Sequence, residues 1–363
     1  MKHCISCRQL LILSFVSMLS PFLRLLPGSV AAVSGSAAWV SAAFSLLPAG
    51  LLLLLLQNLF LALPSGSGLA DALVLSFGEK IGKTVLVLWS LWLIFHSGFL
   101  LRSGADRFIA TVYHGSKPTL FILLTLLLCT IAAMGSIQTM ARTCQIFCPL
   151  LLFVILLVLV FTLQEVEPTF LLPVTKEQTG EILKGMLLCA EPIGVVMVNA
   201  AFLLPYMKQN TAQKRHLLWL PLVCLLSTLF CAISVGSLGE TVTAALPYPF
   251  FVMARDLSIV SGVERIEALV VALWLLPDFV LVTIELMIAA ENLLFLTEYP
   301  KEQYRKRWVA IGTCPAAITA FCIAPNSQSL HIWSNFIVPV VHLGWAFVVV
   351  PMLLLVLTLR KQF

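Results

Sequence analysis

Apolar residues fill ten long stretches of the chain, and short polar segments separate them. Each stretch has roughly the 20 mostly apolar residues that a helix needs to cross a bilayer. The pattern therefore predicts an all-α integral membrane protein with ten transmembrane helices and short connections. The predicted spans cover residues 9–28, 36–62, 83–103, 118–137, 144–163, 184–206, 217–236, 265–292, 308–324 and 334–358.

The composition fits a protein whose solvent is lipid. Hydrophobic residues make up 60% of the chain and charged residues 11%, and the mean hydropathy is +1.02. Soluble domains have about 45–50% apolar and about 25% charged residues. Residues 1–363 are therefore expected to form a single transmembrane domain in the lipid bilayer, with little surface left for a separate catalytic module.

The sequence carries no enzyme or cofactor motif. It has no Gly-x-Ser-x-Gly elbow, no His-Glu-x-x-His helix and no phosphate-binding loop. Cys4-x-x-Cys7 has the spacing of a metal or redox motif, but no second pair follows it at the distance of a zinc site. We expect neither enzymatic activity, nor a bound metal, nor a cofactor.

The positive charges indicate the orientation of the chain in the membrane rather than nucleic-acid binding, because the basic residues lie in loops and form no patch. With the N-terminus inside, most of the 22 Lys and Arg fall in the inner segments, including Lys214-Arg215 and Arg305–Arg307. The segment with Arg102, Arg107 and Lys117 runs against this bias. The distribution predicts cytoplasmic termini and an even number of spans.

The first 35 residues allow a second interpretation. Lys2, an apolar run and the small residues Val30-Ala31-Ala32 are also the features of a cleaved signal peptide. Cleavage would leave nine spans and spoil the charge bias, so we favour a retained first helix.

Helix breakers stand beside polar residues in the first and sixth spans, which open two groups of five. Within a membrane such breaks are tolerated where the freed backbone groups are buried in protein or line a watery cavity. The residues concerned are Ser17, Ser20 and Pro21 in one span, and Glu191, Pro192 and Gly194 in the other.

A matched pair of interrupted helices indicates a LeuT-like transporter fold of two inverted five-helix repeats. The repeats would cover about 9–163 and 184–358, with helices 1 and 6 broken. An unwound helix presents N–H groups on one half and carbonyls on the other, which suits the carboxylate and ammonium of an amino acid. The alternative is that both prolines are ordinary kinks.

Further polar residues lie within the spans. Glu267, Asp278, Glu285 and Asn292 are 11, 7 and 7 residues apart, close to one helical face. Such a face turns towards the bundle interior, where it lines a ligand or proton path or holds protonated carboxyls bonded to neighbouring helices. We expect Asp278 and Glu285 to form one wall of the ligand site, together with His96 and Ser97 of the third span.

Motifs along nearly the whole chain resemble the B subunit of bacterial spore germination receptors, a branch of the amino acid/polyamine/organocation transporter superfamily. The characteristic part is a Tyr-Pro loop that leads into an Arg-x-Glu helix start, with a Trp further along. The residues that carry the resemblance are Ile5-Ser6-x-x-Gln9, Ala38-Trp39-Val40-Ser41, Gly78 to Lys83, Lys117-Pro118, Tyr248-Pro249 to Arg255, Gly262-x-Glu264-Arg265-x-Glu267 and Trp274.

The resemblance implies a nutrient sensor in the spore inner membrane that acts with an A subunit and a lipoprotein C subunit. It implies binding of a small germinant, often an amino acid, in a pocket of the transporter type. Two departures, Ser20-Pro21 where the family usually has Gly and Pro277-Asp278 after Trp274, fall where the ligand would sit.

Two other functions stay open. A secondary amino acid transporter coupled to H⁺ or Na⁺ would share the architecture and would depend on Asp278 or Glu285. A structural assembly subunit would bind partners without a ligand, and substitutions in its pocket would be silent.

Overall fold

Helices make up almost all of the computed structural model, which describes residues 4–111, 115–175, 178–208, 215–261, 266–297, 302–324 and 327–362. The side chains of residues 24–25, 215–216, 256–273, 302, 327–328 and 361–362 are outside this description. The helices are α1 (Cys7–Ser34), α2 (Ala38–Phe44), α3 (Leu46–Leu61), α4 (Leu69–Phe77), α5 (Glu79–Thr111), α6 (Pro118–Ala133), α7 (Ile137–Thr162), α8 (Thr179–Leu203), α9 (Arg215–Leu238), α10 (Glu240–Ala245), α11 (Pro249–Ser261), α12 (Ile266–Phe295), α13 (Glu302–Cys322), α14 (Ser327–Ile332), α15 (Val338–Gly344) and α16 (Val350–Gln362).

Each of the ten predicted ranges overlaps a helical segment, and the all-helical membrane class is confirmed. The count of ten spans stays a prediction. Within the described part of the chain, six stretches are long and apolar enough to cross a membrane: Leu26–Leu61, Glu79–Thr111, Ile137–Glu165, Thr179–Tyr206, Leu217–Leu238 and Ser329–Arg360.

The prediction that helices 1 and 6 are broken is wrong for this structure. α1 continues through Pro21 and Pro27, and α8 continues through Pro192. Proline removes one N–H donor and crowds the carbonyl four residues earlier, but membrane helices tolerate this where neighbouring groups compensate. The carbonyls of Ser17, Leu23 and Leu188 therefore lose their usual helical donor, while each helix stays continuous.

Local chemistry fixes the start of α1 and ties it to the end of α8. The Ser6 hydroxyl accepts a hydrogen bond from the Gln9 N–H at 3.2 Å, and the Gln9 side chain accepts one from the Ser6 N–H at 2.9 Å. Just before this capping box, the Ile5 N–H donates to the Tyr206 carbonyl at 2.8 Å, and the Lys208 N–H donates to the Ile5 carbonyl at 3.0 Å.

The opposite ends of α1 and α8 are also tied. The Ser34 hydroxyl donates to the Glu181 carbonyl at 3.0 Å. One turn along α8, a Cβ on Gly185 would lie 2.2 Å from the Ser34 oxygen and 2.8 Å from that of Ser41, so only glycine allows this approach. Contacts at both ends make α1 and α8 a two-helix unit.

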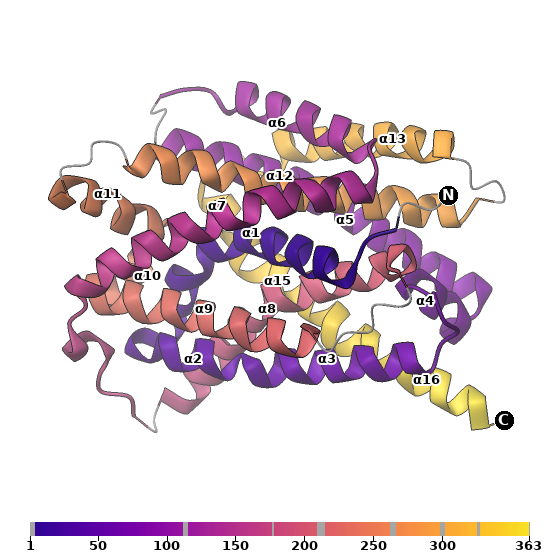
Figure 1. Ribbon diagram of the computed structural model, residues 1–363, viewed down its shortest axis with the longest axis horizontal. Coiled ribbons are helices and arrows are strands. Elements are labelled where there is room, and N and C mark those ends of the chain that lie inside the picture. The colour runs from indigo at the N-terminus through magenta and orange to yellow at the C-terminus, as the bar shows by residue number, and fades with distance from the viewer. Residues whose placement is uncertain are drawn as a thin grey trace.

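The helices run roughly along the longest axis of the molecule, and α1 lies in the interior of the bundle (Figure 1). It packs against α7, α8, α9, α10 and α12, while α6 and α13 cover α5 and α12 on one side. The N and C ends of the chain both lie on the right of the view in Figure 1.

Candidate functional site

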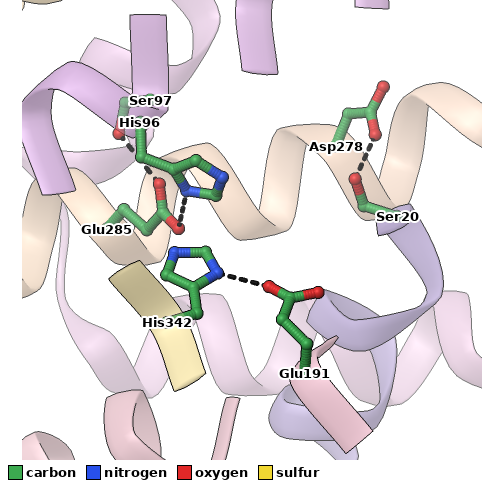
Figure 2. Close-up of polar contacts among 7 residues, drawn as sticks. All are labelled: Ser20, His96, Ser97, Glu191, Asp278, Glu285 and His342. Carbon is green, nitrogen blue, oxygen red and sulfur yellow. Dashed lines mark hydrogen bonds and ion pairs between the residues drawn. The ribbon is translucent and has the colours of Figure 1, made fainter. Parts of the chain in front are cut away.

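Buried polar side chains meet at the centre of the bundle, where α1, α5, α8, α12 and α15 come together (Figure 2). They form two groups. The titratable cluster consists of Glu191, His342, His96, Ser97 and Glu285. The ion-pair cluster consists of Arg107, Asp278 and Ser20.

Glu285 of α12 is fully buried and is bound by two neighbours on α5. One carboxylate oxygen lies 2.8 Å from Nδ1 of His96, and the other accepts a hydrogen bond from the Ser97 hydroxyl at 3.3 Å. The next residue, Gly98, fixes the rotation of α5, because a Cβ there would lie 2.4 Å from the Ala316 carbonyl of α13. The close packing of α5 on α13 thus directs His96 and Ser97 towards α12.

Glu191 of α8 forms the second half of the titratable cluster with Nδ1 of His342 on α15. The two imidazoles meet edge to face, with ring centroids 4.8 Å apart and an angle of 87° between their planes. α15 is flanked by π-helical turns at Trp333–Ile337 and Trp345–Val349, a geometry that occurs frequently at functional sites. The His342 ring lies between Glu191 and the His96–Glu285 pair (Figure 2).

Tryptophans enclose the imidazoles. Trp92 stacks on His96 at a centroid distance of 6.1 Å and meets the edge of His342 at 5.8 Å. Trp89 packs on Trp345 at 4.2 Å. These rings exclude water, and in such low-dielectric surroundings an unpaired charge is costly.

Asp278 of α12 is the centre of the ion-pair cluster. Its Oδ1 accepts a hydrogen bond from the Ser20 hydroxyl of α1 at 2.5 Å, and its Oδ2 pairs with the guanidinium of Arg107 on α5. The guanidinium also lies over the Trp274 ring, 5.1 Å from its centroid, in a cation–π contact. Asp278 therefore joins α1 to α5 through α12.

A small cavity of about 10 Å³, room for about one water molecule, lies beside these clusters, and its wall is mostly apolar with three polar side chains. Ser14 and Ser17 of α1, Asn199 of α8 and Ile284 of α12 line it. The Ser17 hydroxyl donates to the Leu13 carbonyl at 2.7 Å. The Asn199 amide is buried, and neither its oxygen nor its nitrogen has a partner among the described residues.

The structure brings together seven of the ten site residues predicted from the sequence. Ser20 and Asp278 touch, His96 and Ser97 touch Glu285, Glu191 joins them through His342, and Ser17 lines the cavity.

The remaining three predicted residues act through the backbone or packing of α1 and α8. Pro21 and Pro192 lie within continuous helices. Gly194 packs on other elements than the polar clusters, because a Cβ there would meet Leu52 of α3 at 3.4 Å and Ala346 at 3.6 Å.

Arg107, His342 and Asn199 were missing from the predicted site. Arg107 was assigned to a loop, yet it stands 11 residues after His96, which places both on one face of α5. That spacing, the same as between Glu267 and Asp278, was the available signal. The side chain of Glu267 lies outside the described part. For His342 and Asn199 the signal was a polar residue in the middle of an apolar span.

Comparison with known proteins gives a family and a fold. The family model described as "Spore germination protein" matches residues 4–329. Among curated proteins, no sequence match is found.

The crystal structure of MhsT in complex with L-phenylalanine superposes with a TM-score of 0.69 at 11% identity, covering 99% of both chains. A substrate-bound, outward-open Na⁺-coupled sialic acid symporter has a TM-score of 0.45 and 15% identity, covering 93% of this chain and 83% of the other. The likeness to MhsT confirms the LeuT-like fold class, while the two five-helix repeats stay a prediction.

Proposed function

Because the chain belongs to the spore germination protein family, we propose that it is the nutrient-sensing subunit of a spore germination receptor, an integral protein of the spore inner membrane. In this proposal it has ten spans, with both termini in the cytoplasm, arranged as two inverted repeats at about 9–163 and 184–358. Its partners are the receptor's A and C subunits and a small germinant.

The observation that carries the ligand site is the α1–α8 unit, whose two proline-bearing helices meet at buried polar groups. Pro21 and Pro192 free the carbonyls of Ser17 and Leu188, which suit an ammonium group. The unpartnered Asn199 amide, which has two N–H donors, suits a carboxylate. Together they favour a free amino acid as germinant, and the fold is shared with a protein solved in complex with L-phenylalanine.

The ten residues predicted from the sequence remain our candidates for the site, joined by Asn199, Arg107 and His342. A ligand that separates α1–α8 from α12 and α15 would change the contacts Ser20–Asp278 and Glu191–His342. Binding shifts the balance between two packings only when the ligand has different affinities for them. The new packing would then be transmitted to the partner subunits.

The first test is dipicolinate release from spores with and without this gene, against a panel of single amino acids, sugars and nucleosides. We expect loss of the response to one amino acid, restored by the gene together with its A and C partners. An unchanged panel would contradict the receptor role.

A substitution in the cavity tests the site itself. Asn199→Leu should raise the germinant concentration needed for half-maximal release by at least about tenfold, since about 1.4 kcal/mol of lost binding corresponds to a factor of ten. Asn58→Leu, the same change at an exposed position of α3, is the control and should leave the response unchanged at equal protein level.

The shared fold with MhsT favours one alternative, a secondary amino acid transporter coupled to H⁺ or Na⁺. Uptake of labelled amino acid into proteoliposomes that contain only this chain distinguishes the two. Concentrative uptake that depends on an ion gradient supports a transporter, whereas saturable binding without uptake supports a sensor.

A further inference from the structure

We propose that Glu191, His342, His96 and Glu285 form a buried proton-binding site that joins α8 to α5 and α12 through α15. The ligand of this site is H⁺. Its existence is independent of the germinant, and only its link to helix movement rests on the proposed function.

The geometry gives two carboxyl–imidazole pairs in contact. His96 Nδ1 lies 2.8 Å from Glu285, His342 Nδ1 bonds to Glu191, and the rings touch edge to face at 4.8 Å. A neutral imidazole has one donor and one acceptor nitrogen, while a carboxyl group accepts when ionised and donates when protonated. Each Nδ1–carboxyl bond therefore requires one proton between its two atoms, and that proton can reside on either side.

Burial restricts the total number of protons bound by the two carboxyl groups and the two imidazoles. Two ionised carboxylates with two neutral imidazoles carry two negative charges, so the site is neutral once it has bound two further protons. An uncompensated charge is costly in this tryptophan-lined interior. The Ser97 hydroxyl, which also donates to Glu285, adds no charge.

Other charged groups on the helices packed around the site leave this count unchanged. Asp278 is paired with Arg107, and Glu291 lies 3.5 Å from Arg305 of α13. Lys83 near the start of α5 and Lys184 near the start of α8 have exposed side chains, away from the buried centre.

His342 makes the site responsive, because its second ring nitrogen is buried without a hydrogen-bond partner among the described residues. Separation of α8 from α15 would remove Glu191 from Nδ1 as well. If the pair is an imidazolium and a carboxylate, the proton passes from Nδ1 to the Glu191 oxygen, and both groups become neutral without change in the proton count. If the carboxylate instead reaches water, His342 releases its proton to water and the site holds one proton fewer.

Infrared spectroscopy of the purified full chain in lipid nanodiscs tests the site without any germinant. During a pH titration in H₂O and D₂O, the carbonyl band of a protonated buried carboxyl should appear in the wild type. Glu285→Gln or Glu191→Gln should remove part of this band. His342→Gln should keep the band but shift the pH midpoint of its titration. His331→Gln, the same change at an exposed histidine of α14, should leave band and midpoint as in the wild type.

Coupling between the two pairs is the decisive property. If the two pairs form a single site, the shift in titration midpoint caused by His342→Gln should differ between the wild-type and His96→Gln backgrounds. Additive shifts, or a titrating band that none of the four substitutions alters, would overturn the proposal. Circular dichroism at the assay temperature identifies variants that fail to fold, and the comparison uses a pair of substitutions, one from each half of the site, whose two single variants and double variant all fold.

These outcomes separate the two proposals. Normal germinant response together with a titrating band that none of the four substitutions alters would sink the proton site and leave the sensor role intact. Coupled titration in a chain that gives spores no response to any nutrient would support the proton site and contradict the sensor role.

Discussion

The ion-pair cluster and the titratable cluster both lie on α12, seven residues apart, and both join it to α5 on one side. Asp278 faces a guanidinium, which keeps its proton at every accessible pH. Glu285 faces an imidazole, which is charged only when it is protonated. One carboxyl group therefore has a permanent counter-ion, and the other has a partner whose charge can vary.

The difference shows how one helix face can combine a fixed contact with an adjustable one. Arg107 keeps its charge, so the contact of Asp278 with Ser20 always has a cation beside it. The Glu285–His96 pair can be neutral or doubly charged, and both forms leave its net charge at zero. Four predictions test this comparison, beginning with the largest expected effect.

Removal of the permanent cation should be the most damaging single change. Arg107→Met leaves Asp278 buried without a counter-ion and should destabilise the protein by about 3–5 kcal/mol. Arg107→Met combined with Asp278→Leu should recover most of this loss, because no buried charge remains. Thermal unfolding can be followed by thiol labelling of buried cysteines such as Cys129 and Cys189. A double variant that is less stable than Arg107→Met would contradict the fixed-charge interpretation.

Amide substitutions sharpen the contrast between the two carboxyl groups. Asp278→Asn leaves a guanidinium that cannot discharge and should cost about 3 kcal/mol or more. Glu285→Gln leaves an imidazole that can release its proton and should cost about 1 kcal/mol, the value of one hydrogen bond. The same unfolding assay compares both variants, and equal losses would remove the distinction.

Displacement of α8 should affect only the titratable cluster. Gly185→Ala forces α8 away from Ser34 and Ser41, with an overpacking cost of about 1–3 kcal/mol, and should weaken Glu191–His342. Gly194→Ala is the matched control, because its Cβ would meet only ordinary contacts at 3.4 and 3.6 Å. We expect the infrared titration described above to change in Gly185→Ala alone. An altered titration in Gly194→Ala would show that the effect is not specific.

Loss of the two serine hydroxyls should give the smallest effects. Ser20→Ala and Ser97→Ala each remove one hydrogen bond to a carboxyl group, worth about 1 kcal/mol. Ser20→Ala should be the costlier of the two, since its bond is 2.5 Å long and joins a carboxyl group that is paired with a permanent cation, whereas the Ser97 bond is 3.3 Å long. Unfolding midpoints in the reverse order would contradict this ranking.

Apolar periodicity predicted the helices well, because a bilayer-crossing segment leaves little choice of residue. The spacing of Asp278 and Glu285 likewise placed both on one interior face, as the structure has them. The unwound helices were predicted wrongly, because a proline in the sequence does not reveal whether neighbouring helices stabilise its freed carbonyl.

Long-range partners could not be predicted in the same way. His342 and Glu191 are 151 residues apart, and nothing along the chain relates them before the helices pack. Asn199 becomes informative only once both atoms of its amide are seen buried without a partner in the described structure. Helical spacing identifies a face, whereas the identity of the facing helix depends on the fold.

The contact between Ser20 and Asp278 also has a consequence for synthesis of the protein. The two residues are 258 positions apart, so at about 5–20 residues per second the ribosome takes on the order of 13–50 s to supply the partner of Ser20. Arg107 precedes the same carboxylate by 171 positions, so it too is synthesised well before its partner. During nascent-chain insertion, α1 and α5 are therefore in the bilayer with polar groups that have no final partner, and insertion factors or water must shield Arg107 until α12 arrives.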